Sequence, residues 1–185
     1  MEEISKPFNP VEHIKRLQNG CFLFATEILT DPNFASTIVL ICQHSAEGTY
    51  GLVLNRLSHM PLSEVFNSLD IMRNHVRKIH IGGPVQESEL QILHITENPV
   101  HNAIKVAGDV YLGGYWDNID MIVNSESKDL RLFLGYSGWG KGQLENEIKL
   151  GGWEVMLANV KEVFNREDDP WNNGIEDFKQ KYCHF

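Results

Sequence analysis

Residues 131–148 read Arg131-Leu-Phe-Leu-Gly-Tyr-Ser-Gly-Trp-Gly-Lys-Gly-Gln-Leu-Glu-Asn-Glu-Ile148 and carry the pattern that decides the fold. An apolar run ends at Leu134, and glycines follow at positions 135, 138, 140 and 142. Leu144 and Ile148 then lie four residues apart, which places them on one face of a helix. The stretch therefore predicts a strand, a glycine turn and a helix, a layout in which backbone N–H groups can point at a ligand.

Outward from this stretch, short apolar segments predict further strands. Thr37–Cys42 is a β-branched apolar run, and Tyr50–Asn55 returns after a turn at Glu47–Gly48, which predicts a hairpin. Other strands are expected at 21–25, 78–81, 90–95, 104–107, 110–112, 130–134 and 153–157, and helices at 11–18, 61–69, 115–123 and 141–150. Because hairpins mix with crossover connections, the pattern indicates an α+β fold with a mixed sheet.

The composition is that of one acidic globular domain. The chain has 185 residues, of which 42% are hydrophobic, and a net charge of −9. We expect residues 1–16 to form an arm or short helix and residues 17–185 a single domain, because no linker or repeat divides the chain. No apolar run reaches the ~20 residues that span a bilayer, and the N-terminus lacks a secretory signal, so a cytoplasmic protein without membrane contact is expected.

The acidic charge argues against direct DNA binding, because contacts to phosphates need clustered Lys and Arg. The one locally basic stretch, Arg73–His80, fits a solvated loop or helix end. The cysteines at positions 21, 42 and 183 are far apart and odd in number, which disfavours disulfides and a zinc site. Cys42 and His44 would share one strand face, the proximity that a thiolate nucleophile uses. No third orienting group can be identified, however, and a small buried side chain is the commoner role for such a cysteine. Cys183 is expected to be exposed.

Two catalytic motifs are nearly matched. Gly135–Lys141 fits seven positions of a P-loop, but Gly142 stands where a hydroxyl would bind magnesium. Ser137 lies in a partial nucleophile elbow, but Trp139 occupies the place of its last glycine. The only histidine downstream is His184, and a serine without a held base is inert. The glycines are equally well explained by a tight turn.

The histidines do not predict a metal site. None shows H-x-x-x-H or H-E-x-x-H spacing, and no dinucleotide fingerprint is complete, so we expect no metal and no cofactor. His80 and His94 lie in or beside apolar strands, where core or turn roles are commoner than metal ligation.

Three patterns in a fixed order carry a family resemblance. They are G-L-V-L-N-R at 51–56, G-G-P-V at 82–85 and G-Y-x-G-W-x-x-G-Q-L-E-x-E at 135–147, and together they resemble the AlgH/YqgE family of bacterial proteins. The resemblance covers roughly residues 17–175 and implies a mixed, mostly antiparallel sheet curled into a partial barrel with helices packed outside. It implies no established reaction. One branch of that family is linked by name to transcriptional control of alginate production.

The family pattern usually has Ala at the position of Ser137 and Pro or a similar residue at Lys141. Both incomplete motifs therefore depend on residues that the pattern does not require. Our first hypothesis is a non-catalytic binding or regulatory domain for a small ligand or protein partner, as a monomer or small homo-oligomer. The alternative is a small hydrolase that uses polar residues beside the glycine turns, although no catalytic residue can be named.

The candidate binding residues lie at strand ends and on the helix after the glycines. Because polar and glycine residues at strand ends build pockets in sheets, we expect a first group to converge on one concave site. That group is Asn55, Gly82, Gly83 and Tyr136. The further binding candidates are His44, Trp139, Gln143 and Glu147.

Overall fold

The computed structural model describes residues 7–60, 78–99, 101–113, 130–164 and 169–184. In chain order the strands are β1 (Cys21–Ala25), β2 (Ile38–Ser45), β3 (Gly48–Val53), β4 (Ile79–Ile81), β5 (Val85–Ile95), β6 (Ile104–Ala107), β7 (Val110–Leu112), β8 (Leu130–Gly140), β9 (Trp153–Ala158) and β10 (Cys183–His184). The helices are α1 (Pro10–Lys15), α4 (Gln143–Lys149), the 3-10 helix η3 (Val160–Phe164) and α5 (Ile175–Tyr182). The predicted helices at 61–69 and 115–123 lie outside the described residues.

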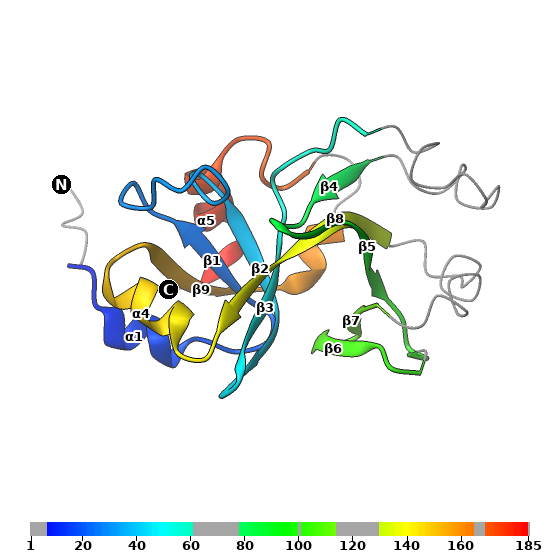
Figure 1. Cartoon of the computed structure of the whole chain (residues 1–185), viewed down its shortest axis with the longest axis horizontal. Helices are drawn as coiled ribbons and strands as arrows, with labels where there is room; N and C mark the ends of the chain where they lie inside the picture. The colour runs from blue at the N-terminus through cyan, green and yellow to red at the C-terminus, as the bar shows by residue number, and fades with distance from the viewer. Residues whose placement is uncertain (1–6, 61–77, 100, 114–129, 165–168, 185) are drawn as a thin grey trace.

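The strands form one curled sheet that does not close (Figure 1). Its order is β10-β9-β1-β2-β3-β8-β5-β7-β6, and β4 pairs with β8 beside this path. The β4–β8 pair is parallel, and the other strand pairs among the described residues are antiparallel. Asn19, just before β1, donates a hydrogen bond to the carbonyl of Lys105 in β6, so the far edge of the sheet curls back toward β1. The predicted fold class, α+β with a mostly antiparallel mixed sheet, is confirmed.

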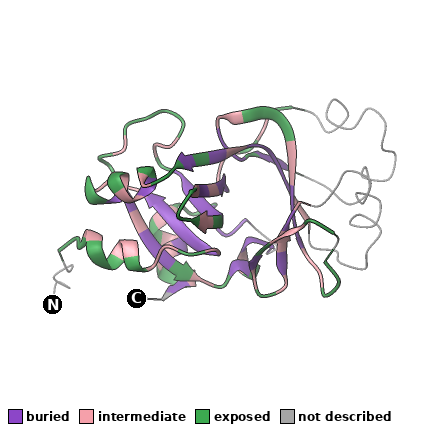
Figure 2. Cartoon of the chain, turned by 60° about the horizontal axis from the view of Figure 1, so that its bottom comes forward, coloured by how far each residue is buried: buried purple, intermediate pink, exposed green. Residues whose placement is uncertain are grey.

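Strands β1 and β2 are buried on both faces, which explains their continuous apolar sequences (Figure 2). Alternate residues face alternate sides of a strand, so each strand contributes to two separate cores. The inner core includes Phe22, Phe24, Ile38, Leu40, Leu52, Leu93, Val106, Phe133 and Phe178. The outer core comprises Cys21, Leu23, Val39, Ile41, Val53, Trp139, Leu144, Ile148, Trp153 and Val155.

Helices cover both faces of this part of the sheet. On the outer face, α4 buries Leu144 and Ile148 in the outer core, as their spacing predicts, and Ile14 of α1 packs beside them. On the inner face, α5 places the ring of Phe178 5.5 Å from Phe22 and 5.8 Å from Phe24. Within the described residues, no helix combines the length and apolarity needed to cross a membrane.

The glycine-rich stretch is a strand over most of its length, which corrects the predicted turn. Strand β8 continues to Gly140, and the turn is limited to the next two residues before α4 begins at Gln143. The first half of β8 pairs with β4 and β5, and its second half pairs with β3. Gly135 lies between the two halves with a φ of 66°, a left-handed conformation that glycine adopts at little cost. The strand therefore bends at Gly135 and changes partners there.

The backbone after β4 crosses β8 at this bend without room for side chains. A Cβ on Gly82 would lie 2.4 Å from the carbonyl oxygen of Gly135, and one on Gly135 would lie 2.6 Å from that of Gly83. Gly82 also donates a backbone hydrogen bond to Leu134 and accepts one from Val53. The crossing therefore links β3 to β8 through backbone hydrogen bonds of Gly82.

We predict that Gly82→Ala destabilises the protein by about 2–3 kcal/mol, because the added methyl group forces the backbones of the crossing apart. Gly140→Ala is the matched control, since the nearest atom to its added Cβ is the flexible end of Gln143, at 3.9 Å. The control is expected to change the free energy of unfolding by less than about 0.5 kcal/mol. Urea denaturation followed by circular dichroism measures both, and equal stabilities would contradict the close crossing.

Candidate functional site

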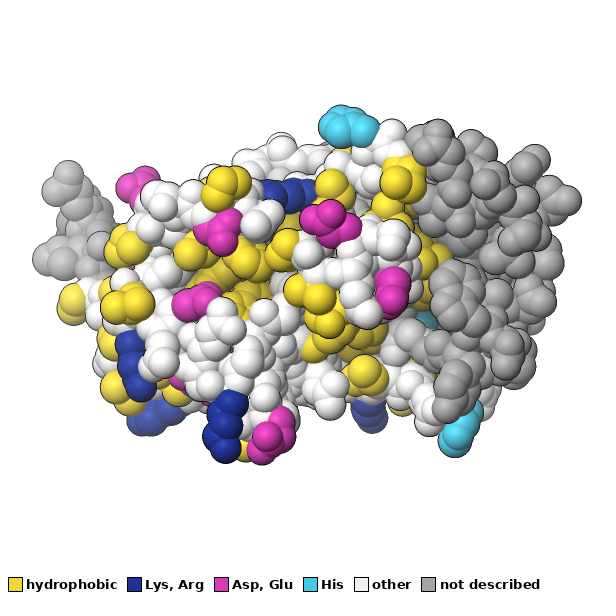
Figure 3. Space-filling model, viewed as in Figure 1, with side chains coloured by type: hydrophobic (Ala, Val, Ile, Leu, Met, Phe, Trp, Pro, Cys, Tyr) yellow, Lys and Arg dark blue, Asp and Glu magenta, His cyan; other side chains and the backbone are white. Residues whose placement is uncertain are grey.

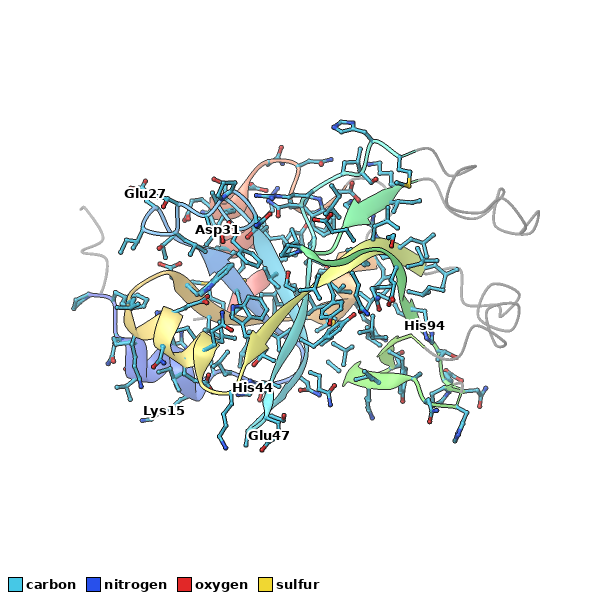
Figure 4. All side chains as sticks on the ribbon, in the orientation of Figure 1. Lys15, Glu27, Asp31, His44, Glu47 and His94 are labelled. Atoms are coloured by element: carbon cyan, nitrogen blue, oxygen red, sulfur yellow. The ribbon has the colours of Figure 1, made fainter. Side chains whose placement is uncertain are left out.

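An open hollow lies where the end of β8 pairs with the β2–β3 hairpin, whose tip Figure 4 marks with Glu47. It measures about 400 Å³, and we refer to it as the hairpin hollow. Its lining residues are Gln43, Ser45, Gly48, Thr49, Tyr50, Tyr136, Gly138 and Trp139. Tyr136 and Trp139 are among the sequence-predicted binding residues, and the other six were missed.

A β-bulge in β2 decides which side chains reach the hollow. The register with β3 shifts between Ile41 and Gln43, so Gln43 lies opposite Tyr50 and His44 lies opposite Thr49. Cys42 points into the inner core. His44 contacts Thr49, and the residue opposite Thr49 on β8 is Trp139 of the outer core, so His44 lies on the other face of the sheet. The predicted pairing of Cys42 with His44 on one strand face is therefore wrong. Burial raises the pKa of Cys42 far above its ordinary value, so its thiol stays protonated.

Two stacked tyrosines form one wall of the hairpin hollow. The rings of Tyr50 and Tyr136 lie 4.3 Å apart, centroid to centroid, with 15° between their planes. Gly138 lies opposite Tyr50, and a Cβ there would be 3.3 Å from the ring of Tyr136, so the glycine leaves space for that ring. Burial, and then the nearby ionisable groups of Cys42, Tyr136 and Glu89, raise the pKa of Tyr50, so its phenol stays protonated at neutral pH.

Trp139, Gln143 and Glu147 are brought together, but as a clamp between α4 and the sheet. The Glu147 carboxylate accepts hydrogen bonds from the indole N–H groups of Trp139, at 3.0 Å, and Trp153, at 2.8 Å. Its other oxygen accepts from the Gln143 amide at 3.0 Å, and Gln143 in turn accepts from the backbone of Gly140. These donors leave the carboxylate committed to internal contacts.

His44 takes part in a chain of polar groups on the outer side. Its Nδ1 shares a 2.7 Å hydrogen bond with the Thr49 hydroxyl, and its Nε2 lies 4.0 Å from a carboxylate oxygen of Glu145. A hydroxyl, an imidazole and a carboxylate in this order resemble a nucleophile, its base and an orienting group. Thr49 is only 7% exposed, however, and 4.0 Å exceeds hydrogen-bonding distance.

The other candidate residues occupy structural positions. The Asn55 amide accepts from the backbone of Ile38 and donates to that of Ser36, which joins the end of β3 to the start of β2. Gly82 and Gly83 form the crossing with β8 and approach the backbone of Tyr136. None of these three residues lines the hairpin hollow. Whether they bind a ligand stays a prediction.

The nucleophile candidates Ser137 and Cys183 are both internal. Ser137 is fully buried, and its hydroxyl donates to the carbonyl of Gly82 at 3.0 Å. Cys183 is 7% exposed and belongs to the inner core, so its predicted exposure is wrong. The short strand β10 pairs with β9 and holds Cys183 there. Burial raises the pKa of Cys183 to about 11.

A second polar cluster was not foreseen from the sequence. Asp169 is buried, and its carboxylate accepts hydrogen bonds from Arg131 at 2.6 Å and Lys78 at 2.8 Å. His80 is 1% exposed beside it, with neither ring nitrogen hydrogen-bonded among the described residues. Burial lowers the pKa of His80 to about 4, so the imidazole is neutral at pH 7. The core position expected for His80 is confirmed. Lys78 is exposed just before β4, as expected, and also pairs with Asp169.

The described residues contain no group of three or more His, Cys, Asp or Glu side chains that could hold a metal ion.

Comparisons with known proteins agree on one family. The model of the family described as AlgH-like matches residues 22–183. A UPF0301 protein of Chlorobaculum tepidum is 31% identical, covering 91% of this chain and 90% of its own length. A UPF0301 protein of Chlamydia pneumoniae is 32% identical, with coverages of 91% and 90%.

Two solved structures share the fold. The solution structure of the AlgH protein from Pseudomonas aeruginosa has a TM-score of 0.66 and 26% identity, covering 87% of this chain and 84% of that one. The crystal structure of protein DIP2367 from Corynebacterium diphtheriae has a TM-score of 0.66 and 26% identity, covering 83% of each chain.

We predict that Glu147→Leu lowers the free energy of unfolding by about 3 kcal/mol, because it removes the acceptor of two buried indole N–H groups. Glu147→Gln keeps an oxygen acceptor and should cost less. Glu145→Leu, the same change two positions earlier on α4, is the control and should cost under about 1 kcal/mol. Urea denaturation followed by circular dichroism ranks the three variants, and a Glu147→Leu variant as stable as the control would disprove the clamp.

The Asp169 cluster gives a prediction with a pH dependence. Burial alone would raise the pKa of Asp169, but hydrogen bonds from Lys78 and Arg131, together with their positive charges, lower it below its ordinary value. The stability gained from this lowered pKa is therefore complete above the unfolded pKa of about 3.9 and is lost as the pH falls through the folded pKa.

We expect Asp169→Asn to cost about 3 kcal/mol at pH 7, the lower end for a buried ion pair, because the Lys78 side chain is 46% exposed. The variant should also lose less stability than the wild type below pH 4. Asp177→Asn removes a half-exposed pair with Lys181 and should cost at most about 0.5 kcal/mol. Urea titrations at pH 7 and pH 3 measure these differences, and parallel acid profiles for Asp169→Asn and the wild type would refute the assignment.

Proposed function

This chain belongs to the AlgH-like family, and from that premise we propose that it is a non-catalytic binding domain with a regulatory role, whose hairpin hollow receives a planar group of its ligand or protein partner. One observation carries the proposal. The stacked rings of Tyr50 and Tyr136 border an open hollow on whose rim the exposed polar side chains of Gln43 and Ser45 lie. Aromatic walls with a few polar groups are typical of binding sites.

The serine and cysteine candidates for a nucleophile in the described residues are buried, which favours a binding function over covalent catalysis. Ser137 and all three cysteines are buried, and Ser137 donates its hydroxyl proton to a backbone carbonyl. Burial raises the pKa of each cysteine, so the reactive thiolate form is disfavoured.

The alternative function, a small hydrolase, has one arrangement in its favour, the chain of Thr49, His44 and Glu145. We do not adopt it, because the Thr49 hydroxyl is buried and the contact of His44 with Glu145 is too long for a hydrogen bond. A hydrolase would need an accessible nucleophile with a positioned base.

The net charge of the chain bears on the type of partner that the protein binds. We propose a cytoplasmic protein, monomeric or a small homo-oligomer, in which residues 17–185 act as one domain without a cofactor. A regulatory role through a small ligand or protein partner agrees better with a net charge of −9 than direct duplex binding does. On the face in Figure 3, most Lys and Arg side chains lie along the lower edge, and one lies in the upper middle between acidic side chains.

We predict that benzamide and nicotinamide, which are planar and carry an amide, bind weakly at the hairpin hollow. Titration of isotope-labelled protein should shift the backbone amide resonances of Gly48, Gly138 and Trp139. Tyr136→Leu should remove these shifts, because it takes away half of the stacked pair. Phe8→Leu, at an aromatic residue 41% exposed outside the hollow, should leave them unchanged. Shifts that survive in Tyr136→Leu, or that centre on other residues, would overturn the proposed site.

A further inference from the structure

Among the described residues, no basic side chain lines the hairpin hollow. Its lining consists of uncharged polar groups, glycines and aromatic rings. The carboxylate of Glu89, an exposed residue of β5, is among the groups that raise the pKa of Tyr50. An aromatic wall with a carboxylate nearby and no internal cation is suited to a positively charged guest.

The rim of the hollow adds a second acidic group. Glu47, which Figure 4 labels at the tip of the hairpin, donates its backbone N–H to the hydroxyl of Ser45, one of the lining residues. Lys141 follows the end of β8 and is the cation nearest to this rim along the chain. Together with the net charge of −9, the two carboxylates favour the approach of a basic partner over an acidic one.

The shape of the hollow favours a side chain over an enclosed small molecule. Binding pockets for small molecules usually surround most of the ligand, whereas this hollow is open along the hairpin. A guanidinium group is flat, stacks on aromatic rings and carries five N–H donors. The amide oxygen of Gln43 and the hydroxyl of Ser45 are acceptors on the exposed rim.

We propose that the hairpin hollow accepts the side chain of an exposed arginine on a protein partner, with the guanidinium against the Tyr50–Tyr136 pair and near Glu89. This inference depends on the proposed function, since it names the chemistry of the group that enters the same hollow. Gln43 and Ser45 accept hydrogen bonds from the guanidinium, and Glu89 supplies the opposite charge. The acidic surface attracts basic partners, so association weakens as salt is added.

The test compares two neutral-ended peptides that differ in one group. N-acetyl-Gly-Arg-Gly amide carries the guanidinium, and N-acetyl-Gly-citrulline-Gly amide carries a flat, uncharged urea of nearly the same shape. Their dissociation constants are measured from the amide shifts of Gly48 and Gly138. We expect the arginine peptide to bind roughly two- to five-fold more tightly at low salt, the gain typical of an exposed cation–π contact.

Charge changes on the exposed rim sharpen the test without disturbing the core. Gln43→Glu should tighten binding of the arginine peptide and Gln43→Lys should weaken it, each by roughly two-fold, while the citrulline peptide changes little. Glu89→Gln should reduce the preference for arginine. Asn173→Lys and Asn173→Glu, at an exposed residue before α5, repeat the net charge changes away from the hollow and should have no effect at 150 mM salt.

The outcomes separate this inference from the proposed function. Equal affinities for the two peptides, or tighter binding of benzamide than of arginine, would overturn the arginine guest while the binding site itself stands. If the preference for arginine were the same in the Gln43 and Glu89 variants as in the wild type, the peptide would bind elsewhere. That result would also overturn the arginine guest. The absence of any shift at the hollow with peptides, benzamide and nicotinamide would reject both the inference and the proposed function.

Discussion

The backbone crossing of Gly82 and Gly83 over the bend of β8 is the constraint on which the rest of the structure depends. Each glycine there approaches a carbonyl of the opposite segment to within a distance that excludes a Cβ atom. The bend at Gly135 lets one strand pair with β4 and β5 in its first half and with β3 in its second. The same strand therefore encloses the inner core and delivers Tyr136 and Gly138 to the hairpin hollow.

Carboxylates inside the protein hold separate elements together, while the hollow is left without a charge of its own. Glu147 ties α4 to two tryptophans of the sheet, and Asp169 ties the C-terminal segment to Lys78 and Arg131. In both places several donors converge on one carboxylate, so these groups are satisfied internally. The uncharged aromatic surface at Tyr50 and Tyr136 is different, because its polar neighbours Gln43 and Ser45 are exposed.

The sequence predicted the architecture better than the site. Apolar runs identified the buried strands and the β2–β3 hairpin, and the spacing of Leu144 and Ile148 identified the apolar face of α4. Local residue patterns decide these features. Residues 135–140 were misread as a turn, since glycines in a bent strand and glycines in a turn look alike without knowledge of the strand partners. The bulge after Ile41 likewise shifts which residues of β2 reach the hollow, and no residue type announces it. The Asp169 cluster was not foreseen, because Lys78 and Arg131 lie far from Asp169 in the sequence.

The burial of the cysteines has a practical consequence for chemical labelling. All three thiols lie in the two cores, where their raised pKa values suppress the thiolate that reacts with maleimides and iodoacetamides. The native protein is therefore a nearly silent background for such reagents while it stays folded. A cysteine introduced at Ser45, on the exposed rim of the hollow, would be the one fast-reacting thiol, and a fluorophore or cross-linker attached there would sit beside whatever enters the hollow.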